Sequence, residues 1–234
     1  MIVSDSNGRL VQALAADLVP TRRLASPRLR ALVWLAFVAV IAIALATACD
    51  IESMLRRFVA APDLCIAAIG SMLTAVLGTV AAFQLSLPDR KSLWALLPVP
   101  AGVLWASASG MGCLRPWAVA DIDPTSLGGS DHCLLFILAL STPLSAFLIL
   151  MLRRGCSLRP TLTSVLGGLA CASAAASLLN FIHSHDASAR DMLVHVFAVG
   201  AVVLGNGVLG GRMLGGKKAD SVVTTRLPKR TLQR

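Results

Sequence analysis

Six long apolar runs divide the chain, and most of its basic residues lie in alternate connections between them. Each run is long enough for a helix to cross a hydrocarbon core of about 30 Å, because an α-helix rises about 1.5 Å per residue. The pattern predicts an all-α, polytopic membrane protein with six transmembrane helices. The runs cover residues 31–49, 64–87, 93–114, 132–152, 160–182 and 192–214.

The basic residues predict how the bundle is oriented in the membrane. Seventeen of the 21 Lys and Arg residues lie before the first run, after the second and fourth runs, or from the end of the sixth run (Arg212) onward. The other connections hold only Arg56, Arg57, Arg115 and Arg190, and they carry most of the acidic residues. By the positive-inside rule, both the N and C termini are predicted to be cytoplasmic.

Composition agrees with a membrane protein and divides the chain into three parts. The mean hydropathy is +0.76, and 14% of residues are charged, against about 25% in a soluble domain. We predict a cytoplasmic head over residues 1–28, a helical bundle over 29–214, and a basic, disordered tail over 215–234.

The formal charge of +9 does not indicate nucleic-acid binding. Its basic residues are dispersed along the predicted cytoplasmic edge, where topology and contact with anionic lipid headgroups of the bilayer account for them. The chain also lacks a P-loop, an HExxH motif and a supported Ser-His-Asp arrangement. We therefore expect no direct contact with nucleic acid, no enzymatic activity and no cofactor.

Small residues recur at four-residue spacing in the last two runs, as Gly207, Gly211 and Gly215 and as Gly168, Ala172 and Ala176. Such stripes allow helices to approach closely in lipid. The sequence leaves open whether they pack helices within one protomer or form a homo-oligomer. Prolines in the third and fourth runs predict kinks there, namely Pro98, Pro100 and Pro143.

The predicted head contains a short amphipathic helix over residues 5–18, with Ser6 or Asn7 as its N-cap and Pro20 as its stop. A helix of this length is marginal in water unless its apolar face is buried. Two surfaces are open to it: the lipid interface, or a groove on a soluble partner. That face consists of Leu10, Val11, Leu14 and Leu18.

Polar residues gather on the opposite, predicted periplasmic side. Asp191 and His195 are four residues apart, so a helix starting there places both on one face. One interpretation is that these residues cap helix ends. The other is that they sense a metal or an oxidant, since imidazole, carboxylate and thiolate bind zinc or copper. The candidates are Cys113, His132, Cys133, His183, His185, Asp186, Asp191 and His195.

An ordered set of short segments resembles the NrsF-type negative regulators of sigma factors, which are six-span anti-sigma factors of bacterial inner membranes. The set extends over nearly the whole bundle. It begins with Leu-Val-Gln-Ala-Leu-Ala-Ala-Asp-Leu-Val-Pro-Thr-Arg-Arg-Leu at 10–24. It continues at 94–98, 133–138, 143–144, 151–155, 158–160 and 210–214.

The resemblance implies a multi-pass protein of the bacterial inner membrane that holds an extracytoplasmic-function sigma factor inactive through its cytoplasmic surface. Residues 5–24 are the candidate for that surface. Relatives resemble the chain at Cys133, but many carry a second cysteine where this chain has Ser184, so a two-cysteine switch is not implied. The predicted partner-binding residues are Leu10, Leu14, Asp17, Leu18, Pro20, Arg22 and Arg23.

Two other functions remain open at this point. The His, Cys and Asp residues on the periplasmic side would suit a small transporter or metal-handling protein. The glycine stripes and basic tail would suit an assembly or scaffold protein. Mutation of His183 and His185 would impair the first function, and Gly211→Leu would impair the second.

Overall fold

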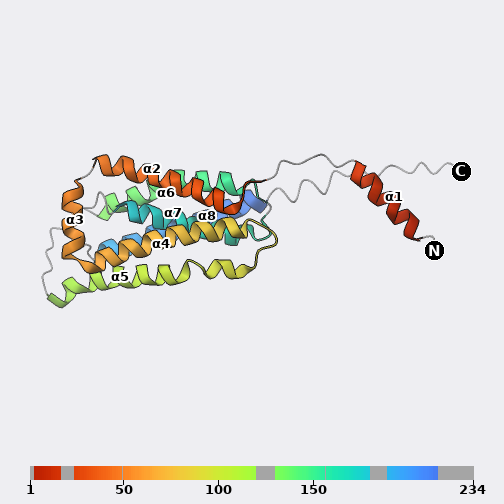
Figure 1. The fold of residues 1–234 in the computed structure, drawn as a ribbon. Coiled ribbons are helices and arrows are strands. Elements are labelled where there is room, and N and C mark those ends of the chain that lie inside the picture. The colour runs from red at the N-terminus through yellow and green to blue at the C-terminus, as the bar shows by residue number, and fades with distance from the viewer. Residues whose placement is uncertain are drawn as a thin grey trace.

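The structure is a computed structural model built of helices (Figure 1). It describes residues 3–16, 24–48, 50–119, 130–155, 157–179 and 189–215. Helices account for most of these residues, which confirms the all-α prediction for the described chain. They are α1 (Val3–Ala16), α2 (Pro27–Ala48), α3 (Ile51–Ala60), α4 (Pro62–Leu85), the 3-10 helix η1 (Ser92–Leu96), α5 (Val99–Val119), α6 (Ser130–Leu152), α7 (Pro160–Leu179) and α8 (Ala189–Gly215).

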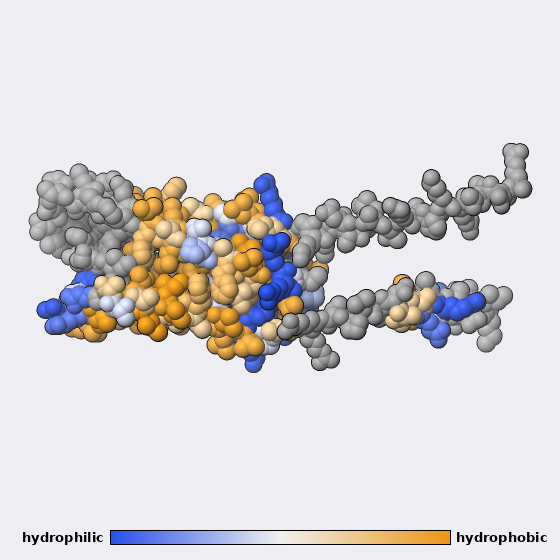
Figure 2. Space-filling view, turned by 90° about the horizontal axis from the view of Figure 1, so that it is seen from above, coloured by the Kyte–Doolittle hydropathy of each residue, from blue (hydrophilic) through white to orange (hydrophobic). Residues whose placement is uncertain are grey.

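Six stretches of the described chain are long and apolar enough to cross a membrane. They are α2, α4, η1 with most of α5, α6, α7 and α8, and they correspond one to one with the six apolar runs. In Figure 2 their side chains form a hydrophobic belt between two hydrophilic ends. The prediction of six spanning helices is confirmed by length and composition.

Prolines begin three of the spans, at Pro27, Pro62 and Pro160. Proline is favoured at the first helical position because the N–H that it lacks would have no partner inside the helix. Ser26 supports the start of α2, since its Oγ accepts a hydrogen bond from the Leu29 N–H at 3.3 Å. The first span therefore begins before its apolar run and includes two basic residues of the head side.

Helix α7 lies in the middle of the bundle, packed against α4, α6 and α8. In its most apolar stretch 78% of the residues are buried, against 11–39% in the other five spans. Gly167, Gly168 and a run of alanines give α7 small side chains, so three neighbouring helices can approach its backbone closely. This composition permits a central position, and the packing of α4, α6 and α8 around α7 establishes it.

The glycine stripes pack α7 against α8 within one protomer. A Cβ atom built on Gly168 would lie 2.8 Å from the Asn206 Cβ and 3.0 Å from the Val203 Cα. On α8, a Cβ on Gly207 would lie 3.0 Å from Val165, and one on Gly211 would lie 3.2 Å from the Thr161 Oγ1. The stripes therefore pack two helices of one protomer against each other, which is one of the two alternatives that the sequence left open.

Proline interrupts the third span but not the fourth. The third consists of η1 and α5, with Pro98 at the junction, so the predicted kink is a complete break in the α-helix. Pro143, in contrast, lies inside the continuous helix α6. Pro98 lies between the two helices, and Pro100 lies in the first turn of α5, where proline is tolerated because the N–H that it lacks would have no partner inside the helix.

Helix α3 was not predicted from the sequence. It crosses the end of the bundle between α2 and α4 (Figure 1). Asp50 caps it, because its Oδ1 accepts hydrogen bonds from the Glu52 and Ser53 N–H groups at 3.1 and 3.3 Å. The signal was present in the sequence as this N-cap before apolar residues at helical spacing.

The head contains the predicted helix, with a different start. Helix α1 begins at Val3, so the prediction that Ser6 or Asn7 caps it is wrong: both residues lie inside the helix. Asp5 in its first turn favours this longer helix, because a carboxylate stabilises a helix N-terminus. The described part of α1 ends at Ala16; Asp17, Leu18, Pro20, Arg22 and Arg23 lie outside the described residues.

Candidate functional site

An unpaired apolar surface lies on the head helix α1, which stands apart from the bundle in Figure 1. The side chains of Val11 and Leu14 are 65% and 61% exposed. Leu10 lies in the same helix, four residues before Leu14, and the two positions share a face. The structure thus confirms a helix at these positions and leaves its apolar side open to a partner.

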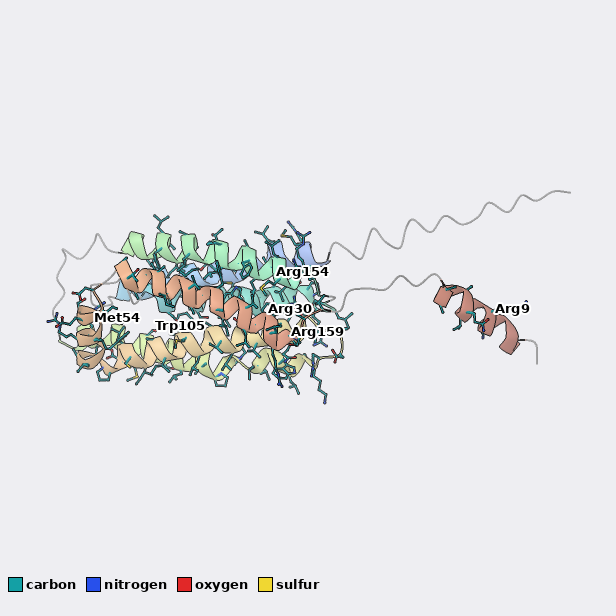
Figure 3. The ribbon with its side chains drawn as sticks, turned by 45° about the horizontal axis from the view of Figure 1, so that its top comes forward. Arg9, Arg30, Met54, Trp105, Arg154 and Arg159 are labelled. Atoms are coloured by element: carbon teal, nitrogen blue, oxygen red, sulfur yellow. The ribbon has the colours of Figure 1, made fainter. Side chains whose placement is uncertain are left out.

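Basic residues collect at the end of the bundle where α2 begins and α8 ends, which we call the basic end; Figure 3 labels Arg30, Arg154 and Arg159 there. They come from the first turn of α2, the α4–η1 and α6–α7 connections, and the last turn of α8. The head therefore joins the bundle at its basic end. The residues are Arg28, Arg30, Arg90, Lys91, Arg153, Arg154, Arg159 and Arg212.

Arg30 differs from the other basic residues because it is buried, with 6% of its surface exposed. Its guanidinium donates hydrogen bonds to the Met151 carbonyl oxygen and, at 3.4 Å, to the Ser86 Oγ. Its Cζ also lies 4.9 Å from the centre of the Phe83 ring. Arg30 thus ties the start of α2 to the ends of α4 and α6.

Two further contacts join α2 to α6. Trp34 is fully buried, and its Nε1 donates to the Leu144 carbonyl oxygen at 3.3 Å. The Phe37 and Phe147 rings pack with their centres 4.8 Å apart at an interplanar angle of 57°. We call the contacts of Arg30, Trp34 and Phe37 the α2–α6 joint. The joint fixes the helix that carries the head against a helix that reaches the opposite end of the bundle.

Sequence reasoning did not find this joint. Arg30 was counted only as one of the charges that set the topology, and Trp34 as part of an apolar run. The signal in the sequence is an arginine in the first turn of a predicted span. Charged groups within apolar helices usually have a specific partner, so such an arginine predicts a contact with a neighbouring helix.

The opposite end carries α3, and we call it the α3 end. The backbone of His132 and Cys133 lies in the first turn of α6, and that of Cys113 in the last two turns of α5. Asp191 and His195 lie in one helix, as predicted, at the start of α8. The remaining candidates, His183, His185 and Asp186, lie outside the described residues.

The described chain contains no group of three His, Cys, Asp or Glu side chains that could hold a metal ion. Because residues 180–188 lie outside it, metal sensing and metal handling stay predictions. The described cysteine side chains are Cys65 and Cys171, both free thiols. Cys171 is buried in the central helix, where a cysteine packs as a small apolar residue.

Buried polar contacts hold the interior of the bundle together. Ser71 and Ser177 hydrogen-bond through their hydroxyls at 2.8 Å between α4 and α7. The Asn206 Nδ2 donates to the Ser145 Oγ at 2.9 Å between α8 and α6. Such contacts stabilise helix association where no hydrophobic drive acts between helices. They involve different helix pairs, which is typical of packing rather than of a path for a solute.

The fold and the site define a multi-pass membrane protein with a short helical head before its first span. Residues 14–215 match the family model described as NrsF, negative regulator of sigma F. The match covers most of the chain, so the chain belongs to the NrsF family and is a negative regulator of a sigma factor. No curated protein and no solved structure matches it.

The family match bears on the head as well as on the bundle. It begins at Leu14, so it includes the end of α1 and the whole linker to α2. Most of the predicted partner-binding residues fall within it, whereas Leu10 lies before it. The resemblance inferred from the sequence is confirmed at the level of the family.

Proposed function

We propose that the protein is a bacterial inner-membrane anti-sigma factor that binds an extracytoplasmic-function sigma factor through residues 5–24. The observation that carries this proposal is the exposed apolar face of α1, where Val11 and Leu14 have no cover. A helix of 14 residues is marginal alone and needs a surface on which to bury that face. Family membership supplies the class of partner.

The charge of α1 favours a protein groove over the lipid interface. The helix contains one acidic residue, Asp5, and one basic residue, Arg9. Helices that lie on anionic membranes carry several Lys or Arg residues on their polar face. A helix with balanced charges is better suited to a groove on a soluble partner, into which the apolar residues of the helix insert.

Within this proposal each part of the segment has a role. Leu10, Leu14 and Leu18 fill an apolar groove of the sigma factor, while Asp17, Arg22 and Arg23 make polar contacts that fix the register. Pro20 ends the helix, since it cannot donate a backbone hydrogen bond. Bound in this way, the sigma factor is held at the cytoplasmic face of the membrane and away from RNA polymerase.

Release requires a signal on the periplasmic side that favours a second state of the bundle, in which the head binds the sigma factor less tightly. To change from mostly bound to mostly free, the two states must differ in affinity by about 5 kcal/mol. The α2–α6 joint is the proposed route of this signal. Helix α6 begins next to Cys133 at the α3 end and contacts Arg30 through Met151 at the basic end.

The test changes one residue on each face of α1 in the full-length protein. In Leu14→Asp a carboxylate replaces an apolar anchor, whereas in Gln12→Asp the same group stands on the opposite face of the helix. Each variant is purified from membranes together with the sigma factor encoded nearby, and sigma-dependent transcription is measured in the same cells.

We expect the wild type and Gln12→Asp to retain the sigma factor, and Leu14→Asp to lose at least about tenfold in affinity, since burying a charge without a partner is costly. Transcription should rise only with Leu14→Asp. Retention of the sigma factor by Leu14→Asp at normal membrane levels would show that α1 is not the binding segment.

A further inference from the structure

A surface cavity of about 650 Å³ lies at the basic end, in the connection between α4 and α5. Charged residues line one part of it, namely Asp89, Arg90 and Lys91. Apolar residues of η1 line the other part, among them Leu93, Trp94 and Leu96. We propose that this cavity binds an anionic phospholipid, with the phosphate at the charged part and an acyl chain along the apolar part.

The two faces of η1 explain the apolar wall. Trp94 and Leu97 pack on Ala81, Ala82 and Leu85 of α4, which holds η1 against the bundle. Leu93 and Leu96 stand on the other side, 67% and 60% exposed. Residues three apart lie above one another in a 3-10 helix, so the two leucines form one continuous apolar surface.

The charged part of the cavity favours an anion. Arg90 lies 3.8 Å from Asp89, measured from its Nε to the Oδ2, and both side chains are largely exposed. No ion pair joins Lys91 to a described residue. The three side chains carry a net charge of +1, and an anionic headgroup gains about 1 kcal/mol for each Lys or Arg near the membrane surface.

The position of the cavity selects a lipid over the other occupants. The third span begins at Ser92, so η1 forms the edge of that span and the charged residues 89–91 come directly before it. An acyl chain can therefore reach Leu93 and Leu96 while its headgroup stays beside the charged residues. A free phosphate would use the charges alone. The head helix α1 contains one acidic and one basic residue, so it offers no net negative charge to the basic residues of the cavity.

The test compares two pairs of basic residues at the same end of the bundle. Arg90→Gln with Lys91→Gln removes the charges of the cavity. Arg153→Gln with Arg154→Gln removes two exposed charges from the α6–α7 connection, where they line no part of this cavity. Full-length protein is purified in detergent, stripped of lipid, and titrated with phosphatidylglycerol or phosphatidylcholine, and bound lipid is counted by native mass spectrometry.

We expect the first pair to weaken phosphatidylglycerol binding about tenfold or more, from the loss of two charges, and to leave phosphatidylcholine binding unchanged. The second pair should change neither. An apolar-wall variant, Leu93→Ser with Leu96→Ser, should weaken both lipids. Circular dichroism and gel filtration confirm that each variant is folded.

Four outcomes would overturn the proposal. Unchanged phosphatidylglycerol binding by the first pair would show that the lipid does not bind at this cavity. An equal loss in both pairs would assign the effect to the general charge of the basic end. Displacement of the lipid by millimolar glycerol 1-phosphate would reduce the site to a phosphate site. A several-fold gain in binding by Leu14→Asp would make the head the occupant of the cavity in the intact protein.

Discussion

At the scale of single residues, the least expected feature is a buried arginine without a described carboxylate partner. Arg30 lies where two helices end: its donors reach the Met151 carbonyl in the last turn of α6 and Ser86, the residue that follows α4. The carbonyl end of a helix carries a partial negative charge. Two helix ends therefore stabilise one guanidinium, and the arrangement works only if all three helices are in place.

This arrangement predicts the effect of removing the guanidinium. Arg30→Ala should lower the free energy of unfolding by about 2–4 kcal/mol, because the hydrogen bond to the Met151 carbonyl, made by a charged group, contributes about 1.5–3 kcal/mol and the longer one to Ser86 adds less. Arg30→Lys should recover part of the loss, since an ammonium group can reach one acceptor but lacks the planar fork. Unfolding of the purified protein by heat or denaturant measures both.

Arg28→Ala is the matched control, because Arg28 is exposed and lies two residues before Arg30 in the same turn. If Arg28→Ala and Arg30→Ala lowered the free energy of unfolding equally, the loss of stability would come from the charge at the start of α2. The hydrogen bonds of the α2–α6 joint would then make no specific contribution. An increase in sigma-dependent transcription with Arg30→Ala alone would further support the joint as the route to the head.

At the scale of elements, the packing of α7 against α8 depends on glycines that differ in their surroundings. A Cβ on Gly168 meets the backbone of α8 at 3.0 Å, whereas one on Gly205 meets nothing within 4 Å. The same Gly→Ala substitution should therefore have opposite effects at the two positions, which separates packing from helix propensity.

Gly168→Ala should lower the free energy of unfolding by about 1–3 kcal/mol, the usual cost of overpacking a close contact. Gly205→Ala should raise it by up to about 1 kcal/mol, because alanine favours a helix over glycine. Thermal unfolding in detergent compares the two. A loss of equal size at both positions would show that the glycines act through the backbone of α7 and α8 and not through their contact.

Helix α3 illustrates a second kind of feature at this scale. Its apolar residues Ile51, Leu55 and Val59 follow one another at four-residue spacing and remain exposed. On the adjacent face of the helix, Arg56 and Glu52 form an exposed pair at 3.8 Å. A short helix of this kind lies along a membrane surface rather than across it, which suits its place between two spans.

At the scale of the whole molecule, the two ends of the bundle differ in charge, because the acidic residues Asp50, Glu52 and Asp63 accompany the arginines of the α3 end. The head joins the basic end. The positive-inside rule then predicts a cytoplasmic basic end. Alkaline phosphatase fused after residue 60, at the α3 end, should be active, because the enzyme folds only in the periplasm. The same reporter fused after Arg90 should be inactive.

A reversed pattern would place the head in the periplasm, away from any sigma factor, and would contradict the proposed function directly. A fluorescent protein fused at the same two sites serves as the complementary reporter, since it should give signal only after Arg90. The two reporters together separate a wrong orientation from a fusion that fails to insert.

Local patterns in the sequence were enough to predict the number of spans, the basic end, the helical head and the resemblance to the family. Each is a sum of local properties, such as the length of an apolar run or the count of basic residues in a connection, and such sums do not depend on which helices touch. The sequence patterns did not predict α3, because its ten residues lie in a short connection between two apolar runs. They also placed the start of α1 too late, since the helix begins at Val3.

The way in which those helices contact one another depends on tertiary packing. The tertiary structure places α7 at the centre of the bundle and packs the glycine stripes of α7 and α8 against each other. It also buries Arg30, which the sequence shows only as one of the basic residues that set the orientation, in contact with α4 and α6. Those features arise from contacts between residues that are distant in the chain: Arg30 meets Ser86 at a separation of 56 residues and Met151 at 121. No local pattern specifies such a partner, because its position is fixed by the packing of all the helices between.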